Sequence, residues 1–574
     1  MLKKLTDTPL VAVFLRKFIS NRYTLFVAFM LFYSAALQYI GGLPSLINHF
    51  FTEAPILLGI YYSLNLLLKP GRWTPWIAAL PPVMMYGAYD TFFLAYGNVF
   101  HITDFNELPE LIDVLPATYK IFLAALIFTP LLLILSHIHF KKIKQAFIGV
   151  FVMGLVGFST QYSPGPVITA FENTGEGVDE SSDASSVWAK GRLAMLVYFE
   201  AKRKQTQALT VADHNRDQYV KDMLSQASAL AENVNKRNTH LIVLESFLDP
   251  TLLENVSFSK DPRHPDYFAR YASSQGFSIA PVFGGSSAQS EFEALCGVPA
   301  FRKLGSVEFN IFGGAPTYCL PGILSKIGYQ TISSNGFKPN FFNAIKAYNG
   351  IGFQEVYFAS EYTPKRKTYF STGIIPKYEH YMFDGDLFDA NIKFVKQRLQ
   401  EQPAKPLFNY VLSIYGHFPH YMDPVKRPQV LSMKSTFDDK DLLLAANQHY
   451  YRTQVLSRYL TELIEADPNS LIILLSDHLP PLREGLLSYQ KLRYLGNVEG
   501  STFMNRLLVI ENGKAVKYPT IHHYDVPSLI YNYLTDGKYC KDNPCNLANL
   551  KIPKEQYEKK YLRLMSHAGD EKEK

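Results

Sequence analysis

Long apolar segments fill the first part of the chain, whereas the rest has the mixed pattern of a soluble α/β domain. Five segments, near residues 23–42, 50–68, 74–97, 119–138 and 145–162, are close to the roughly 20 residues that a membrane-spanning helix needs. A cleaved signal peptide is the alternative for the first segment. It is disfavoured because four more segments follow and no small-residue cleavage site is evident. The pattern predicts a multi-pass α-helical membrane domain followed by an α/β domain.

Basic residues predict how these segments are oriented. Positive charges precede the first segment and lie between the second and third and between the fourth and fifth, whereas the other two loops carry acidic residues. By the positive-inside rule the N-terminus is cytoplasmic, and five crossings place everything after about residue 163 outside. The basic residues are Lys3, Lys4, Arg16, Lys17, Arg22, Lys69, Arg72, Lys141, Lys142 and Lys144, and the acidic ones are Glu53, Asp104, Glu107, Glu110 and Asp113.

The pattern divides the chain into four parts. We expect a transmembrane domain at 1–162, a connector with linking helices at 163–235, a catalytic domain at 236–555 and a charged tail at 556–574. The connector includes the small-residue and acidic stretch 175–186, which is typical of a flexible tether. Residues 101–116 have an amphipathic rhythm that predicts an interfacial helix. Asp90, near the outer end of a segment that Pro81 and Pro82 are expected to kink, is interpreted as having a local structural role.

Charge and cysteine content narrow the classes of function. The net charge of +6 comes largely from short clusters beside apolar segments. The sequence has no long basic stripe of the kind that nucleic-acid-binding proteins show, so nucleic-acid binding is disfavoured. Cys540 and Cys545 predict a small disulfide-closed turn, and Cys296 could pair with Cys319. A zinc site of all four thiolates is the alternative, but the pairs lack CxxC spacing. Two disulfides in an outward-facing domain indicate a periplasm.

Three apolar runs in the second part end in chemically capable side chains. Residues 238–250 read NTHLIVLESFLDP and place Glu245 after a buried strand. Residues 406–419 and 470–480 repeat the pattern, ending at His417 and at the pair Asp477 and His478. Ligands of open α/β sheets bind at the carboxyl ends of the strands, so these side chains are expected to meet at one edge.

A fourth stretch supplies a hydroxyl group. Residues 283–292, FGGSSAQSEF, place Ser286 and Ser287 after two glycines and before a predicted helix start. Glycine lets the backbone approach a bulky anion, and the N–H groups of a helix start can bind phosphate oxygens. A divalent ion held by two carboxylates and an imidazole would lower the pKa of the hydroxyl and ready it for attack on phosphorus. The residues alone leave Ser286 and Ser287 both open.

Several motifs together resemble one known family. The stretches ESFLDP, GGSSAQSEFEALCGVP, SIYGHFPHY, SDHLPPL and HHYDVPSLI, after five predicted crossings, are similar to the lipoteichoic acid synthase family. That family belongs to the alkaline phosphatase and sulfatase superfamily and also resembles periplasmic phosphoglycerol and phosphoethanolamine transferases. The resemblance implies an alkaline-phosphatase-like extracytoplasmic domain.

The resemblance also assigns roles to residues. It implies one Mn²⁺ or Zn²⁺ ion held by Glu245, Asp477, His478 and the nucleophile, with His417 contacting substrate. The family nucleophile is usually threonine and lies four residues before the glutamate of a Ser-Glu-Phe triplet, which gives Ser287 here and leaves Ser286 as the alternative.

One departure from the family changes the expected substrate. Where lipoteichoic acid synthases contact glycerol phosphate with a histidine and an aspartate, this chain has Asn335, a candidate substrate contact, and Phe337. We therefore expect a transferase of a Gram-negative inner membrane. It would move phosphoglycerol from a phospholipid such as phosphatidylglycerol, through a seryl intermediate, to a glycan or glycolipid.

The sequence leaves two alternatives to this transferase open and disfavours a third. The first is transfer of phosphoethanolamine from phosphatidylethanolamine. The second is a catalytically inactive, lipid-binding relative. A true sulfatase is disfavoured because Ser287 lacks the proline and arginine of a C/S-x-P-x-R motif.

Overall fold

The structure of the protein is a computed structural model that describes residues 21–41, 44–173, 178, 183–211, 216–363, 368–370, 379–548 and 551–570. Two compact units form the chain, one of residues 1–94 and 98–208 and the other of residues 95–97 and 209–574. Lys3, Lys4, Arg16, Lys17, most of the predicted tether at 175–186 and the end of the tail at 571–574 lie outside the described residues.

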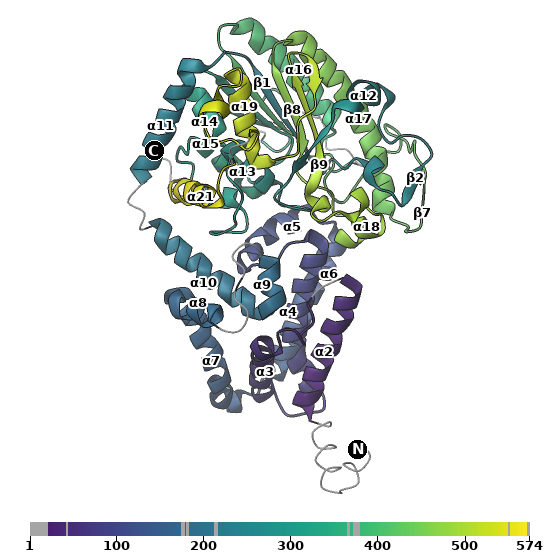
Figure 1. The fold of residues 1–574 in the computed structure, drawn as a ribbon. Helices are drawn as coiled ribbons and strands as arrows, with labels where there is room; N and C mark the ends of the chain where they lie inside the picture. The colour runs from purple at the N-terminus through teal and green to yellow at the C-terminus, as the bar shows by residue number, and fades with distance from the viewer. Residues whose placement is uncertain are drawn as a thin grey trace, which may run out of the picture. The chain divides into compact units, whose positions relative to one another are not determined.

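All five predicted membrane segments form helices in the first unit (Figure 1). Three of them are long and apolar enough to cross a membrane, over Arg22–Ile40, Phe50–Leu67 and Ala117–His137. The third segment contains Pro81, Pro82 and Asp90, which lower its apolar character. The five helices are α2 (Arg22–Gly41), α3 (Phe50–Leu67), α4 (Thr74–Tyr96), α6 (Ala117–His137) and α7 (Ile143–Tyr162).

Further helices complete the first unit. The predicted interfacial helix at 101–116 is instead two short pieces, η2 and α5. Asp90 is buried and forms an ion pair with Arg192 at 2.5 Å, which ties α4 to α10. This contact fits the structural role expected for Asp90. The remaining helices are η2 (Ile102–Glu107), α5 (Leu108–Val114), η3 (Phe140–Lys142), α8 (Pro164–Glu172), α9 (Asp183–Lys190) and α10 (Arg192–Val211).

A mainly parallel sheet forms the centre of the second unit. Its strand order in the described residues is β11-β3-β9-β8-β1-β6-β4-β5, with β10 on β9 and with β9 antiparallel to its neighbours. The small pair β2 and β7 lies apart. The strands are β1 (Thr239–Leu244), β2 (Val256–Phe258), β3 (Gly276–Ile279), β4 (Gln330–Asn335), β5 (Glu355–Phe358), β6 (Leu407–Leu412), β7 (Met433–Ser435), β8 (Leu471–Ser476), β9 (Met504–Glu511), β10 (Lys514–Val516) and β11 (Ile521–His522).

Strands β1, β6 and β8 lie at the centre of the sheet and are buried on both faces, which explains why their sequences are continuous apolar runs. All three run parallel. Val243 of β1 pairs with Leu412 of β6, and Leu244 pairs with Ser476 of β8. The residues that follow these strands therefore emerge at one edge of the sheet.

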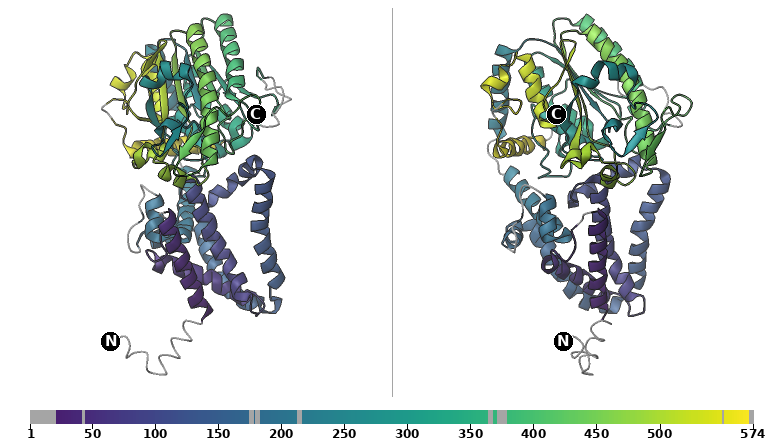
Figure 2. Two further views of the ribbon diagram at one scale, coloured as in Figure 1. Left: turned by 90° about the vertical axis from the view of Figure 1, so that its right-hand side faces the viewer. Right: turned by 45° about the vertical axis from the view of Figure 1, so that its right-hand side comes forward.

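Helices cover both faces of this sheet. Figure 1 shows α13, α14 and α19 on one side of the sheet and α16 and α17 on the other, and in Figure 2 these two long green helices lie together on one face. The α-helices of this unit are α11 (Arg216–Asn233), α12 (Pro265–Tyr271), α13 (Ser287–Cys296), α14 (Leu320–Lys326), α15 (Ala344–Ile351), α16 (Asp384–Glu401), α17 (Lys440–Ala466), α18 (Leu486–Lys491), α19 (Val526–Leu534), α20 (Tyr539–Asp542) and α21 (Lys554–Ala568). The 3-10 helices are η4 (Pro250–Leu252), η5 (Ala272–Ser274), η6 (Glu308–Ile311), η7 (Phe341–Asn343), η8 (Leu495–Asn497), η9 (Ser501–Phe503) and η10 (His523–Asp525).

The second unit extends beyond the predicted limits of 236 and 555. Tyr219 and Leu230 of α11 lie in its main hydrophobic core, as do Tyr561 and Leu564 of α21. Although α21 is rich in charged residues, its apolar positions recur on one side of the helix and are buried. The stretch from residue 556 to Ala568 is therefore part of the packed domain.

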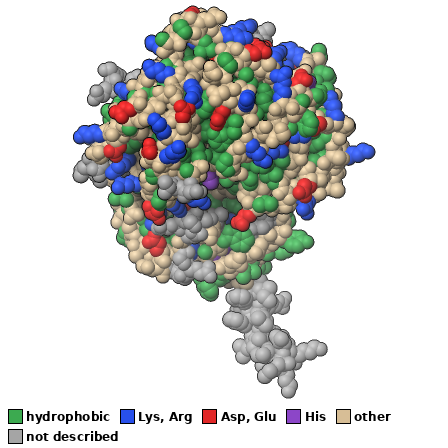
Figure 3. All heavy atoms as spheres, turned by 45° about the horizontal axis from the view of Figure 1, so that its top comes forward, with side chains coloured by type: hydrophobic (Ala, Val, Ile, Leu, Met, Phe, Trp, Pro, Cys, Tyr) green, Lys and Arg blue, Asp and Glu red, His purple; other side chains and the backbone are tan. Residues whose placement is uncertain are grey.

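Two disulfides stabilise this unit. Cys296, at the end of α13, is joined to Cys319, which precedes α14, and Cys540 is joined to Cys545. On the face shown in Figure 3, lysine and arginine side chains lie among aspartate and glutamate side chains.

Candidate functional site

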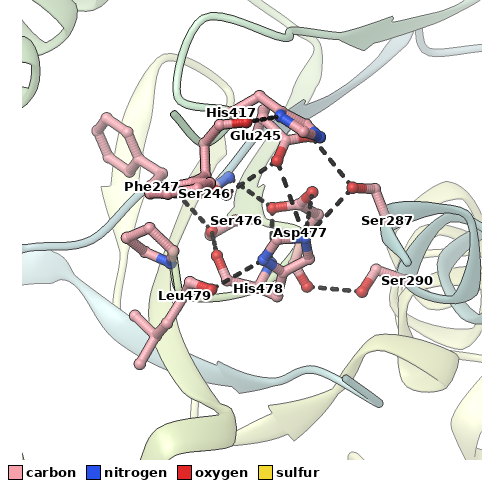
Figure 4. Close-up of polar contacts among 12 residues, drawn as sticks. Glu245, Ser246, Phe247, Ser287, Ser290, His417, Ser476, Asp477, His478 and Leu479 are labelled. Carbon is pink, nitrogen blue, oxygen red and sulfur yellow. Dashed lines mark hydrogen bonds and ion pairs between the residues drawn. The ribbon is translucent and has the colours of Figure 1, made fainter. Parts of the chain in front are cut away.

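The ends of β1 and β8 bring three ligand-type side chains together. Glu245 follows β1, and Asp477 and His478 follow β8. One ligand atom from each lies within 4.8 Å of the others, and all three residues are buried. Figure 4 shows these side chains converging on one point. The sheet thus assembles the cluster that the sequence predicts.

The two carboxylates are held by a tight turn. Asp477 Oδ1 accepts hydrogen bonds from the backbone N–H of Ser246 at 2.7 Å and of His478 at 2.6 Å. Ser246 donates its hydroxyl to Glu245 Oε1 at 2.8 Å. Its backbone adopts φ 48°, a left-handed conformation that is costly for a residue with a Cβ. The turn fixes both carboxylates while leaving an oxygen of each directed into the cluster.

This arrangement suits a divalent cation. Burial and the neighbouring Asp477 hold the pKa of the Glu245 carboxyl well above its usual range. Asp477 Oδ2 is buried without a hydrogen-bond partner. Within the described residues, no lysine or arginine forms an ion pair with either carboxylate. A bound cation would satisfy the orphan oxygen and balance the negative charge, so the residues fit a metal ion.

His478 is oriented as a metal ligand would be. Its Nδ1–H donates to the carbonyl of Leu479 at 2.9 Å, which leaves the lone pair of Nε2 free. Nε2 lies 3.4 Å from Asp477 Oδ2 and 3.8 Å from Glu245 Oε1. Ser476 supports this strand end by donating its hydroxyl to the carbonyl of His478 at 2.8 Å.

Ser287 places its hydroxyl in the cluster. It is the first residue of α13, and its Oγ donates to Glu245 Oε2 at 3.1 Å and lies 3.3 Å from His478 Nε2. Ser286 instead occupies the N-cap position with φ 59° and makes no capping bond through its side chain. The geometry therefore favours Ser287 over Ser286 as the nucleophile. The N-terminal N–H groups of α13 lie beside this hydroxyl, where phosphate oxygens would bind.

His417 lies beside Glu245 and Ser287 in Figure 4. Its Nδ1–H donates to the carbonyl of Phe418 at 2.5 Å, so Nε2 carries the free lone pair. Burial lowers the pKa of His417 to about 4, and the imidazole is neutral at pH 7. A neutral imidazole with a free Nε2 accepts a proton before it can donate one. This makes the ring a proton carrier rather than a fixed positive charge.

Asn335, the candidate substrate contact, lies buried at the end of β4 with both ends of its amide hydrogen-bonded inside the protein. Its Nδ2 donates to the hydroxyl of Tyr348 at 3.0 Å, and its Oδ1 accepts from the N–H of Phe337 at 2.8 Å. The side chain is buried and shapes the turn after β4. Phe337 is also buried, with its ring against Phe341 and Tyr381. Both groups of the Asn335 amide are therefore used inside the protein.

Sequence reasoning missed the serines that position the site. Ser246 and Ser476 hold the carboxylate turn and the end of β8, and Ser290 donates its hydroxyl to the carbonyl of Asp477 at 2.6 Å. Ser413 accepts the backbone N–H of Glu245 at 3.2 Å. In the sequence, Ser246 and Ser476 are marked only by adjacency to a ligand and Ser290 only by its spacing of three from Ser287, whereas Ser413 has no such signal.

The fold is that of the alkaline phosphatase and sulfatase superfamily, whose metal-dependent members include phosphotransferases and sulfatases. The family model described as Sulfatase matches residues 237–532, more than half of the chain. The protein therefore belongs to the sulfatase family, and the predicted fold class and superfamily are confirmed.

A curated relative comes from Rhizobium meliloti (strain 1021), where it is provisionally assigned to cyclic β-1,2-glucan modification. It is 24% identical over 265 residues, which is 43% of this chain. The match spans only 36% of the relative's length.

Solved structures similar to this chain include a phosphoglycerol transferase and a lipoteichoic acid synthase. The phosphoglycerol transferase GacH of Streptococcus pyogenes, in complex with sn-glycerol-1-phosphate, is 15% identical with a TM-score of 0.46, covering 62% of this chain and 92% of that one. The lipoteichoic acid synthase LtaP of Listeria monocytogenes is 16% identical with a TM-score of 0.42, covering 53% and 72%. Similarity at this level adds nothing to the family assignment.

Proposed function

We propose that this protein is a membrane-anchored, metal-dependent phosphotransferase. It transfers phosphoglycerol from a membrane phospholipid, through a covalent intermediate on Ser287, to an envelope glycan or lipid. One observation carries the proposal: the Ser287 hydroxyl lies 3.1 Å from Glu245 and 3.3 Å from His478 in a buried cluster of metal-ligand side chains. The choice of phosphoglycerol rests on the resemblance of the ESFLDP and SEFEALCG stretches to phosphoglycerol enzymes.

The metal would be held by Glu245, Asp477, His478 and the Ser287 hydroxyl. Two carboxylates with one imidazole suit Mn²⁺ and Zn²⁺ alike. When bound, the ion would supply Lewis-acid stabilisation of the serine oxygen and of the charge on phosphorus.

The protein's own residues then carry the transfer in two halves. In the first, Ser287 Oγ attacks the phosphorus of the donor, a seryl phosphoester forms, and the bond to the diacylglycerol oxygen breaks. His417 Nε2 takes the serine proton and delivers it to the departing diacylglycerol oxygen. In the second, an acceptor hydroxyl attacks the same phosphorus and its proton passes through His417 back to Ser287. Atoms and protons balance over the cycle.

The proposed location is the inner membrane of a Gram-negative cell, with the catalytic domain in the periplasm. Three apolar helices support a membrane anchor, and the two disulfides fit an oxidising compartment. A periplasmic glucan is the first acceptor to test, since the curated relative is provisionally assigned to modification of a cyclic β-1,2-glucan.

Intact mass spectrometry of the full-length protein tests the donor half-reaction. The protein, loaded with Mn²⁺ or Zn²⁺, is incubated with vesicles of phosphatidylglycerol or of phosphatidylethanolamine. We expect a phosphoglycerol adduct on the wild type and on Ser286→Ala, and none on Ser287→Ala, because Ser287 Oγ contacts both Glu245 and His478, whereas Ser286 is the N-cap of α13.

A phosphoethanolamine adduct instead would identify phosphatidylethanolamine as the donor and phosphoethanolamine as the transferred group. If folded, metal-loaded protein gives no adduct with either lipid, the transferase proposal is wrong and a lipid-binding role is favoured.

A further inference from the structure

A fully buried ion pair lies behind the end of β1. Arg452 of α17 donates from Nε to Asp384 Oδ2 at 2.6 Å, and the two side chains are 3% and 1% exposed. Asp384 is the first residue of α16, and its second carboxylate oxygen is buried without a hydrogen-bond partner. Burying two charges is costly, so a pair in this position needs a reason beyond joining two helices.

The guanidinium of Arg452 reaches the backbone of the metal-ligand turn. Its Nη2 donates to Ser413 Oγ at 3.4 Å, and the same Oγ accepts the N–H of Glu245 at 3.2 Å. The guanidinium also lies over the ring of Phe247, 4.9 Å from its centroid. Arg452 therefore supports the turn from both sides of Glu245.

Gly416 keeps the space for this approach open. A Cβ at that position would lie 2.1 Å from the Glu245 carbonyl oxygen and 2.3 Å from Arg452 Nη1. Only a glycine leaves room for both the carbonyl and the guanidinium beside the loop after β6.

The turn itself needs support. Ser246 is held at φ 48°, which its side chain disfavours, and the Glu245 carboxylate depends on this turn for its direction. Ligand direction decides metal affinity, and contacts behind the ligands commonly set it.

We propose that Arg452, fixed by Asp384, is a positioning residue that presets Glu245 for a divalent cation. The inference rests on the proposed metal site. Arg452 touches neither the ligand oxygens nor Ser287 in the contacts described, so its effect passes through Ser413 and the turn.

The competing explanation is that the pair only fastens α16 to α17. The protein carries its own control for this, because Arg458 and Asp389 form an ion pair at 2.5 Å between the same two helices, with side chains 53% and 52% exposed. If the buried pair only joined the two helices, breaking either pair would change the stability of the protein but not its affinity for metal.

The experiment measures Mn²⁺ affinity of the full-length protein in detergent by titration calorimetry after removal of bound metal. We expect Arg452→Lys and Asp384→Asn to weaken Mn²⁺ binding by about 10- to 100-fold, as loss of such outer contacts typically does. Lysine cannot bind Asp384 and Ser413 together as a guanidinium does. Arg458→Met and Asp389→Asn should leave the affinity within about twofold, since an exposed pair contributes little.

A paired substitution separates folding from positioning. Arg452→Met with Asp384→Leu replaces the buried charges by apolar side chains of similar size, which proteins often tolerate. We expect this variant to keep a cooperative thermal transition yet bind Mn²⁺ as weakly as Arg452→Lys. If folded Arg452→Lys or the folded double variant binds Mn²⁺ with wild-type affinity, the inference is overturned. If the wild-type protein itself binds no metal, the proposed metal site is overturned.

Discussion

Glu291 shows how burial at a single residue makes stability depend on pH. It lies one turn after Ser287 in α13 and accepts hydrogen bonds from the hydroxyls of Tyr348 and Tyr410, the latter at 2.7 Å. Burial raises its pKa to about 7, even though both tyrosine contacts favour the charged form. In the folded protein the neutral acid is therefore the main form up to about pH 7.

Glu291→Gln should flatten the pH profile of stability. A raised carboxyl pKa contributes stability below the ordinary value of 4.5, and this is lost as pH rises through about 7. Between pH 5 and 8 we expect the wild type to lose about 2 to 3 kcal/mol more of its unfolding free energy than Glu291→Gln, which stays neutral. Denaturant titrations of both proteins, with metal chelated, measure the difference.

Other buried carboxyls titrate in both proteins and cancel in this comparison. Parallel profiles for the wild type and Glu291→Gln would show that Glu291 is charged throughout the range.

At the scale of elements, close helix packing depends on single glycines. Gly352 caps α15 at φ 103°, and a Cβ there would lie 2.3 Å from the Cα of Gly322 in α14. Gly328 has a similar φ of 96°, but a Cβ there would meet nothing within 4 Å. A residue with a Cβ would therefore be strained at both positions, but only at position 352 would the Cβ also clash with a neighbouring helix.

Alanine substitutions at the two glycines should separate strain from packing. Gly328→Ala is expected to cost about 1 to 2 kcal/mol, the price of a left-handed alanine. Gly352→Ala should cost about 3 kcal/mol or more, because α14 and α15 must also move apart. Thermal unfolding of the two variants beside the wild type measures both costs, and equal losses would mean that the helices adjust freely.

The strand ends were predictable, because an apolar run followed by a polar residue is visible in a single sequence. Glu245, Asp477 and His478 could be expected to meet for this reason. Arg452 could not, because it lies within an amphipathic helix and reaches the site only through the packing of α17 on the sheet. The inward turn of Asn335 depends on Tyr348, which no local pattern links to it.

At the scale of the whole molecule, the number of crossings remains a prediction with a clear test. Five crossings and three crossings both place the catalytic domain outside, because both numbers are odd. The loops differ: if α4 and α7 also cross, Lys141 lies in the cytoplasm and Asn106 outside, whereas crossing by α2, α3 and α6 alone reverses both.

We expect Lys141 to be cytoplasmic, because Lys141, Lys142 and Lys144 form a basic cluster of the kind retained on that side. In spheroplasts, a membrane-impermeant maleimide should label Asn106→Cys directly and Lys141→Cys only after the membrane is permeabilised. The four native cysteines are paired in disulfides, so the unsubstituted protein provides the unlabelled control. The reverse labelling pattern would establish three crossings, with α4 and α7 packed without spanning the membrane.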